Sequence, residues 1–549
     1  MSRSHLCHWL LLLGLSGAGW AHPGADLALK GGAVYCLDDS RSWAEAVAVR
    51  EGRIVYVGSD QGLEPWVDSR TRVIPLQGRL VLPGFCDAHV HPLLAGLEAM
   101  RCPLSELKSA SEVLARVADY AHDHPELTWI VGTGWGLHLW PQGNPQRQQL
   151  DAALPDRPVA LESLDGHSFW LNSKALQLCG ITSATPDPEG GRIERDAQGN
   201  PSGTLREKAM ALAQRHLPAI PVSERKQALR WGLKQLNQVG ITSFHEANAG
   251  PEDLQAYAEL EKSGELTARV TVAQTIDSVE NLQLRRQLYS GRLVHPDAVK
   301  LFLDGVIEAR TAALLEPYTD SSSRGELLYP PEVLNPLVER LAGAGFQVHM
   351  HAIGDRAVRA GLDSFARLKV GDLRHTIAHL QLVDSVDRGR FAALGVVANV
   401  QAFWCQADES VQEFSNPLLG SPRDDQQYPL RALFAAGATV AGGSDWSVTT
   451  PDPIQAIAVA VTRQPPGSQE PAWIPSQRVT LDQMLAAYTR NGAFLNHCER
   501  DRGTIEAGKF ADLVVLDRNL FQLAPEQIYQ TRVDLTLFEG RVLYEATDE

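Results

Sequence analysis

Two histidines separated by one residue, His89 and His91, end the apolar run at 79–89. Side chains two positions apart on a β-strand point to the same face, so both imidazoles can reach one metal ion. The same spacing recurs at 122/124 and 349/351. The pair at 122/124, in AHDHP, lies in a polar helical stretch before a proline, which predicts a solvated surface. For the pair at 89/91, spacing alone leaves two interpretations open, metal ligands or histidines with a structural role.

Four further ionisable residues interrupt apolar runs later in the chain: Lys300, His351, His379 and Asp445. Burying such groups without a partner is costly, and convergence on a metal would satisfy them together with the first histidine pair. For one residue alone, the alternatives are a core histidine bonded to the backbone, or a salt bridge from Lys300 to Asp304 or Asp445. All of them together, at the ends of successive runs, favour a metal site.

These residues need a scaffold that brings distant strand ends together. Apolar runs of strand length recur with helical segments after most of them, which is typical of a parallel β/α barrel with its chemistry at the strand ends. The eight predicted strands are 79–89, 241–247, 268–276, 298–305, 345–352, 375–381, 395–404 and 439–446. The interval between the first two predicted strands is too long for one helix, and it predicts an inserted subdomain at about 100–225.

The two ends of the chain share a different pattern. Short alternating strands separated by Gly-containing turns occupy 26–58 and return at 511–517 and 533–545. Terminal strands need partners to bury their apolar faces. We therefore predict one discontinuous β-sandwich, built from 22–78 and 495–549, around a barrel at 79–494.

The first 21 residues predict a cleavable export signal. Arg3 precedes a short apolar stretch at 9–15, and small residues lead to Ala21. We expect a periplasmic or secreted mature protein. Six cysteines would remain after Cys7 is removed, and an oxidising compartment would permit disulfides without specifying their pairing.

The overall charge argues against nucleic acid as a partner. Acidic residues outnumber basic ones by 66 to 50, and the formal net charge is −16. After the signal, no apolar stretch reaches the roughly 20 residues that a membrane-spanning helix needs. We expect a small-molecule substrate and leave homo-oligomerisation open.

Several motifs resemble those of a known family. They are PGFCDAHVHP, VKLFLDG with EARTAAL, HMHAIGDRAVR, IAHLQ, GSDWSVTTPDP and the tail motif GTIEAGKFADLVVLDRN. Together they are similar to the amidohydrolase superfamily, in the YtcJ-like branch that includes N-substituted formamide deformylase. The resemblance implies an α/β protein with a (β/α)8 barrel of the metal-dependent hydrolase type, and an accessory β-sandwich.

The resemblance also implies roles for individual residues. His89 and His91 would bind the more buried of two divalent ions, most simply zinc, and His351 and His379 would bind the second. Lys300, carboxylated by CO2, would bridge them, because a carbamate can hold two cations and an ammonium cannot. Asp445 would complete the site and act as general base and then acid. His349 lies one layer deeper, where we favour a structural role.

The reaction that follows is hydrolysis of a non-peptide amide, such as an N-substituted formamide or an N-acyl amine. Deamination or the opening of a cyclic amide on the same site is the first alternative. One metal ion with an unmodified Lys300 would favour deamination. A non-catalytic or regulatory exported protein with the same fold is the second alternative, although all six ligand positions are filled.

Four residues are candidate substrate contacts. His167 and Asn172 belong to the motif DGHSFWLNSKAL, which also resembles this branch and lies in the predicted insertion. Asn172 has an equally good alternative as the cap of the helix that begins at Ser173. Trp404 and Trp446 follow predicted strand ends, where they would line the pocket or pack in the core.

Overall fold

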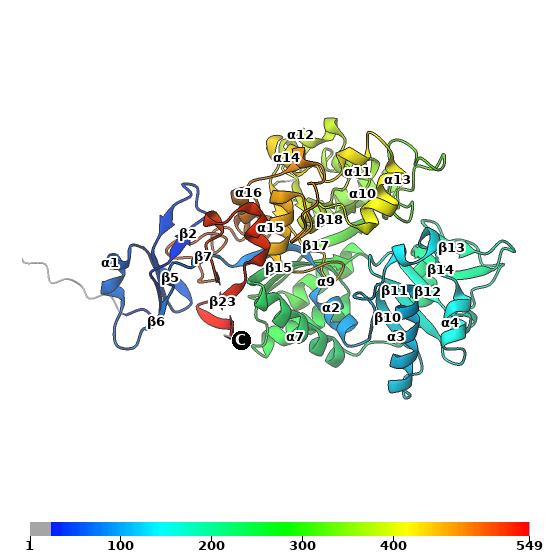
Figure 1. The fold of residues 1–549 in the computed structure, drawn as a ribbon, viewed down its shortest axis with the longest axis horizontal. Helices are drawn as coiled ribbons and strands as arrows, with labels where there is room; N and C mark the ends of the chain where they lie inside the picture. The colour runs from blue at the N-terminus through cyan, green and yellow to red at the C-terminus, as the bar shows by residue number, and fades with distance from the viewer. Residues whose placement is uncertain (1–23, 370, 548–549) are drawn as a thin grey trace, which may run out of the picture.

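The computed structural model describes residues 24–369 and 371–547. Three parts follow one another along the long axis of the molecule, as Figure 1 shows. Strands from the chain ends form one extremity, an α/β barrel lies in the middle, and a second sheet forms the other extremity. The predicted export signal at 1–21 lies outside the described residues.

The middle part is the barrel that the sequence predicts. Its eight strands run parallel in the order β21-β20-β19-β18-β17-β16-β15-β8. Each overlaps one predicted run, so the prediction is confirmed. The strands are β8 (Phe85–Val90), β15 (Ile241–Ala249), β16 (Arg269–Thr275), β17 (Val294–Phe302), β18 (Gln347–Ala352), β19 (Thr376–His379), β20 (Val397–Val400) and β21 (Val440–Gly442).

Helices follow the strands, as a parallel sheet requires for its crossovers. They pack apolar side chains such as Leu236, Tyr257 and Leu341 against the strands in one continuous core. The helices are α2 (Pro92–Ala99), α7 (Val222–Gln238), α8 (Pro251–Lys262), α9 (Val279–Tyr289), α10 (Pro331–Gly343), α11 (Asp355–Phe365), α12 (Ser385–Leu394), α14 (Leu430–Ala435) and α15 (Pro453–Thr462).

The barrel closes between its first strand, β8, and its last, β21. Asp445 N donates to His89 O (2.8 Å), and His91 N donates to Trp446 O (2.9 Å). The carboxylate of Asp87 accepts from His89 N (3.0 Å) and Ser444 N (3.1 Å). Residues more than 350 positions apart in sequence are thus joined through their backbones at the carboxyl end of both strands.

The run predicted as the first barrel strand is in fact two strands. β7 (Leu80–Pro83) pairs with β2 (Ala33–Tyr35) and β22 (Leu513–Leu516), outside the barrel, and the barrel strand begins only at Phe85. Pro83 has no N–H to continue a ladder, and a Cβ on Gly84 would lie 2.3 Å from the Thr242 hydroxyl. The boundary predicted at residue 79 is therefore too early by one short strand.

Both ends of the chain build the terminal sheets, as the sequence predicts. One sheet has the order β24-β23-β22-β7-β2-β3 and the other β5-β4-β1-β6, and apolar side chains including Leu29, Val81 and Val515 form a core between them. The remaining strands are β1 (Leu27–Lys30), β3 (Trp43–Ala44), β4 (Ala46–Arg50), β5 (Arg53–Gly58), β6 (Arg72–Pro75), β23 (Val533–Phe538) and β24 (Arg541–Glu545).

The insertion between α2 and α7 forms its own six-stranded sheet, at the opposite end of Figure 1 from the terminal strands. It packs against Val306 and Ala309 in the segment after β17. Its strands are β9 (Cys102–Pro103), β10 (Ile130–Trp135), β11 (Val159–Ser163), β12 (Ser168–Leu171), β13 (Gly191–Arg195) and β14 (Pro201–Glu207). The insertion therefore lies next to the carboxyl end of the barrel strands.

Two further expectations concern the cysteines and membrane-spanning helices. The six cysteines from Cys36 to Cys498 are all free thiols in the structure. In residues 24–369 and 371–547, we find no helix with the length and apolarity needed to cross a bilayer.

Candidate active site

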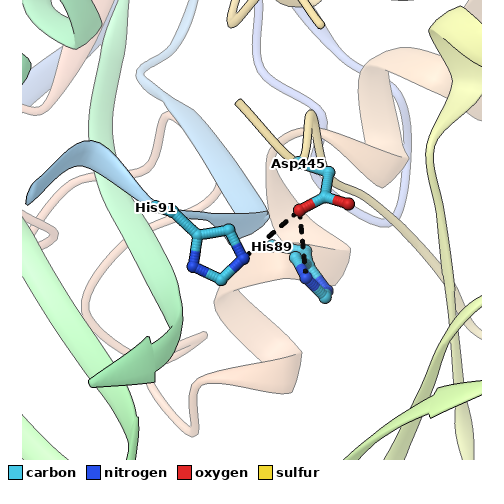
Figure 2. Close-up of side chains that lie close together, drawn as sticks. All are labelled: His89, His91 and Asp445. Atoms are coloured by element: carbon cyan, nitrogen blue, oxygen red, sulfur yellow. Dashed lines mark ion pairs between the residues drawn. The ribbon is translucent and has the colours of Figure 1, made fainter. Parts of the chain in front are cut away.

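His89, His91 and Asp445 meet where the barrel closes. Asp445 Oδ1 lies 3.4 Å from His89 Nε2 and 3.3 Å from His91 Nε2, and Figure 2 shows both rings directed at the carboxylate. One donor atom from each residue lies within 4.8 Å of the other two. Imidazole nitrogens with a carboxylate oxygen are a donor set that suits a divalent zinc-like ion. The backbone bonds across the closure hold the three residues together.

Lys300 lies beside this group, near the end of β17. Its Nζ is 3.3 Å from His89 Nε2, and only 3% of the residue is exposed. Burial lowers the pKa of Lys300 to about 8, although Asp445 and Glu246 oppose the shift. Lys300 forms no ion pair with Asp304 or Asp445, the two partners considered from the sequence. Asp304 instead accepts hydrogen bonds from the backbone N–H groups of Ile353, Gly354 and Ala313.

His351 and His379 lie next to each other, and His379 also lies close to Asp445. Their ring centroids are 4.5 Å apart, and His379 Nδ1 is 3.8 Å from Asp445 Oδ2. His351 Nε2 lies 3.2 Å from the Gly305 carbonyl, so Nε2–H donates to it and Nδ1 carries the lone pair. His379 Nδ1 is buried and has no hydrogen-bond partner in the described part of the chain. A buried nitrogen without a hydrogen-bond partner is suited to binding a metal ion.

The carboxylates determine the charge of the site. Burial opposes ionisation of Asp445, but the hydrogen bond from His91 and the charges of His379, His91 and Lys300 lower its pKa to about 2. Burial likewise opposes a charge on His91, and Asp445 and Glu246 raise its pKa to about 9. The Asp445 carboxylate beside these rings therefore provides negative charge of the kind that a divalent ion requires.

The six predicted ligands all line one cavity of about 380 Å³. Its outer wall contains apolar residues of α2, including Leu93 and Leu97, and residues of the insertion, including Glu162 and His167. The cavity volume lies at the lower end of the range for small-molecule sites. A small molecule therefore fits this site.

His167 is one of the ionisable residues that the insertion contributes to the cavity. His167 Nδ1 lies 2.9 Å from Glu207 Oε2, and Thr311 Oγ1 donates to the other oxygen of Glu207 (2.8 Å). Burial lowers the pKa of His167, but Glu207 outweighs it and raises the pKa to about 9. The ring is 5.0 Å from that of His351. A cationic donor thus lies next to the group of predicted ligands.

Asn172 is a correction to the predicted substrate contacts. It caps α5 (Ser173–Leu178): its Oδ1 accepts from Ala175 N (2.9 Å) and Val159 N (3.0 Å), and its Nδ2 donates to two carbonyls. Asn172 is fully buried and is absent from the residues that line the cavity. Its hydrogen-bonding capacity is used up by backbone, which confirms the capping alternative.

Trp404 and Trp446 are also not among the residues that line the cavity. Trp404 stacks on His379 with ring centroids 5.4 Å apart, and its Nε1 donates to Thr449 Oγ1 (3.2 Å). Trp446 stacks instead on Trp231 of α7 (5.7 Å). Both indole rings thus show the packing that was one of the two alternatives for them, and Trp404 packs against a predicted ligand.

Glu246, a buried residue of β15, is a further part of the site that was not predicted from the sequence. Its Oε1 lies 3.2 Å from His91 Nδ1, and Tyr257 Oη donates to its Oε2 (2.6 Å). A carboxylate that orients a metal-binding histidine is a common arrangement around zinc. The rule that selected Lys300, an ionisable residue in an apolar run, also applies to ITSFHEA and would have identified Glu246.

Comparison with known proteins agrees with this geometry. A family model described as the amidohydrolase family matches residues 72–544, which cover the barrel, the insertion and the terminal strands from β6 onward. The chain belongs to the amidohydrolase family. This match confirms the family resemblance that the motifs indicated. The family is one of metal-dependent hydrolases.

Individual relatives match the amidohydrolase over nearly its whole length. The protein YtcJ of Bacillus subtilis is 30% identical, with 94% of this chain and 98% of YtcJ covered. N-substituted formamide deformylase of Arthrobacter pascens is 28% identical, with 95% and 99% covered. The crystal structure of an uncharacterised metal-dependent hydrolase from Pyrococcus horikoshii has a TM-score of 0.73 at 25% identity, with 91% of this chain and 99% of that chain covered.

Proposed function

We propose that this amidohydrolase is an exported enzyme that hydrolyses a non-peptide amide bond of a small molecule, with an N-substituted formamide or an N-acyl amine as the substrate class. The observation that carries the proposal is the meeting of His89, His91 and Asp445 in the wall of a cavity of small-molecule size. The similarity to N-substituted formamide deformylase supports the choice of substrate class.

The donor set fits two divalent ions, most simply zinc. His89, His91 and Asp445 would hold one ion, and His351 and His379 would contribute the free nitrogens described above to the other. A divalent ion bound there lowers the pKa of a water molecule and polarises a carbonyl group. Glu246 fixes the His91 ring through Nδ1 and leaves Nε2 directed at Asp445.

Lys300 would bridge the two ions after its amine has reacted with CO2. The reaction needs the neutral amine, and burial, which lowers the pKa of Lys300 to about 8, makes that form accessible near neutral pH. Carboxylation replaces a buried cation with an anion, which relieves the repulsion between Lys300 and any metal bound by His89.

The protons would be moved by Asp445. Its carboxylate is ionised and lies within 4 Å of nitrogens from three histidines, so it can accept a proton from the attacking water and return it to the departing amine. His167, held in its cationic form by Glu207, would donate a hydrogen bond to an oxygen of the substrate. A carboxylic acid and an amine are the products.

Metal analysis and a substrate screen test this function together. We expect purified protein to contain close to two divalent ions per chain, to lose activity to chelators, and to release amine from N-formyl or N-acyl substrates. One ion at full activity, with an unmodified Lys300, would favour the deaminase alternative instead. Release of ammonia from a cyclic or heteroaromatic substrate, with no amide hydrolysis, would contradict the proposed reaction.

The export proposal has its own measurement. We expect the native mature chain to begin near His22, because cleavage should follow Ala21. Intact-mass spectrometry of protein recovered from outside the cytoplasm checks this expectation. A mass that includes Met1 to Ala21 would contradict it.

A further inference from the structure

Behind the proposed metal site, inside the barrel, lies a row of buried polar side chains that the reaction does not use. His349 of β18 lies between His89 and His245 of β15, with ring centroids 4.7 Å and 4.6 Å away, and all three residues are 0% exposed. Asn496, which follows α17 (Arg490–Leu495), ends the row. Burial of three histidine side chains in a barrel core needs a reason, because apolar residues would pack there at lower cost.

The row begins with a hydrogen bond to a proposed metal ligand. His89 Nδ1 and His349 Nε2 are 2.8 Å apart. A hydrogen bond between two imidazole nitrogens needs a proton on one and a lone pair on the other, so one proton lies between the two rings. If that proton is on His89 Nδ1, then His89 Nε2 has its lone pair free for a metal. If it is on His349, His89 Nε2 carries a proton and cannot bind one.

The far end of the row has only one arrangement. His245 Nδ1 lies 3.1 Å from Asn496 Oδ1, and the amide nitrogen of Asn496 lies 3.5 Å from Cys86 Sγ. A carbonyl oxygen only accepts hydrogen bonds, so His245 must carry its proton on Nδ1. Burial lowers the pKa of His245 to about 4, so the ring is neutral and Nε2 has a lone pair.

In the middle of the row, the tautomer of His245 affects the tautomer of His349. His245 Nε2 and His349 Nδ1 are both buried, and neither has a hydrogen-bond partner among the described residues. With the ring centroids 4.6 Å apart, a lone pair on His245 Nε2 favours a proton over a second lone pair on His349 Nδ1. A proton on His349 Nδ1 leaves Nε2 to accept from His89, which is the arrangement that frees His89 Nε2.

We propose that Asn496, His245 and His349 are positioning residues that set the tautomer of His89, so that its Nε2 is ready to bind metal. The inference rests on the proposed ligand role of His89. It assigns a function in the active site to Asn496. This residue lies toward the opposite end of the barrel strands from the proposed ligands and touches none of them.

Zinc affinity tests the first step of the row without any substrate. In His349→Leu the acceptor for His89 Nδ1 is lost, and zinc should bind 10- to 100-fold more weakly, as is typical when a partner of a metal-binding histidine is removed. In His349→Gln the amide oxygen can accept the same hydrogen bond, and affinity should return close to that of the wild type. Stripped protein would be titrated with zinc in competition with a chromogenic chelator, and thermal melts would establish that each variant is folded.

A double-mutant cycle tests whether Asn496 acts through His349. Asn496→Leu should weaken zinc binding by about 10-fold, whereas Asn496→Asp keeps an acceptor and should not. Asn491→Leu is the matched control, because Asn491 lies on α17 and donates to Val440 O outside the row. It should leave zinc affinity unchanged. Adding Asn496→Leu to His349→Leu should cause no further loss.

Three results would overturn the inference. A folded His349→Leu protein with wild-type zinc affinity would remove the role of His349. Losses that multiply in the double variant would show that Asn496 and His349 act independently. If the wild-type protein bound no zinc, the ligand role of His89 and the positioning role of the residues behind it would both be wrong. If every variant bound zinc normally, only the positioning role would be wrong.

Discussion

Asp445→Asn is expected to slow turnover by about 10² to 10⁴-fold, the usual contribution of a positioned acid-base group. Asparagine keeps the shape and an oxygen donor, so metal content should fall only modestly. It cannot carry the proton from the attacking water to the leaving amine. The loss should therefore be larger for an alkylamine amide, which needs that proton to leave, than for an activated anilide.

Steady-state rates on both substrates, with metal content measured on the same samples, check this expectation. Asp384→Asn is the matched control, since Asp384 caps α12 and is not among the residues that line the cavity, and asparagine caps helices equally well. That variant should behave as the wild type. Equal losses on both amides, with metal retained, would show that Asp445 orients the water only and that another group, such as His167, protonates the amine.

Lys300→Ala should lose most of its metal and reduce activity by more than about 100-fold, beyond what residues supporting a ligand contribute. Two dications among neutral imidazoles need anionic ligands, and the carbamate of Lys300 would supply one. Lys300→Glu, or a short carboxylate added with the metal, should restore part of both. Elemental analysis and turnover of the same preparations measure the effect.

Lys234→Ala provides the control, because Lys234 is exposed on α7. Removing it should change neither metal content nor rate. A Lys300→Ala protein that bound metal and turned over normally would contradict the carbamate. Mass spectrometry of the wild type under native conditions would then show an unmodified lysine.

The barrel could be predicted because its strands are buried on both faces and read as apolar runs. The same property made Lys300, His351, His379 and Asp445 visible, since each interrupts such a run. The break at Pro83 was not visible: β7 and β8 are both apolar, and only the pairing of β7 with β22 separates them. That pairing joins residues that are distant in sequence.

The substrate contacts were harder to predict than the ligands. Asn172 is polar in an apolar stretch, like the ligands, but its partners are nearby backbone groups that sequence spacing does not reveal. Trp404 and Trp446 follow strand ends, yet the direction of an indole ring depends on its neighbours in three dimensions. Glu207, the partner of His167, belongs to a different strand of the insertion, and no motif connected the two.

The sheet shared by the two chain ends has a consequence for how the protein is made. β7 leaves the ribosome early, but its partner β22 follows more than four hundred residues later. At about 5 to 20 residues per second, synthesis of that interval lasts roughly 20 to 90 seconds. During this time the N-terminal strands have unpaired edges that can bind chaperones or aggregate. Completion of the fold, and with it the protection of the early strands, thus depends on the last segment to be synthesised.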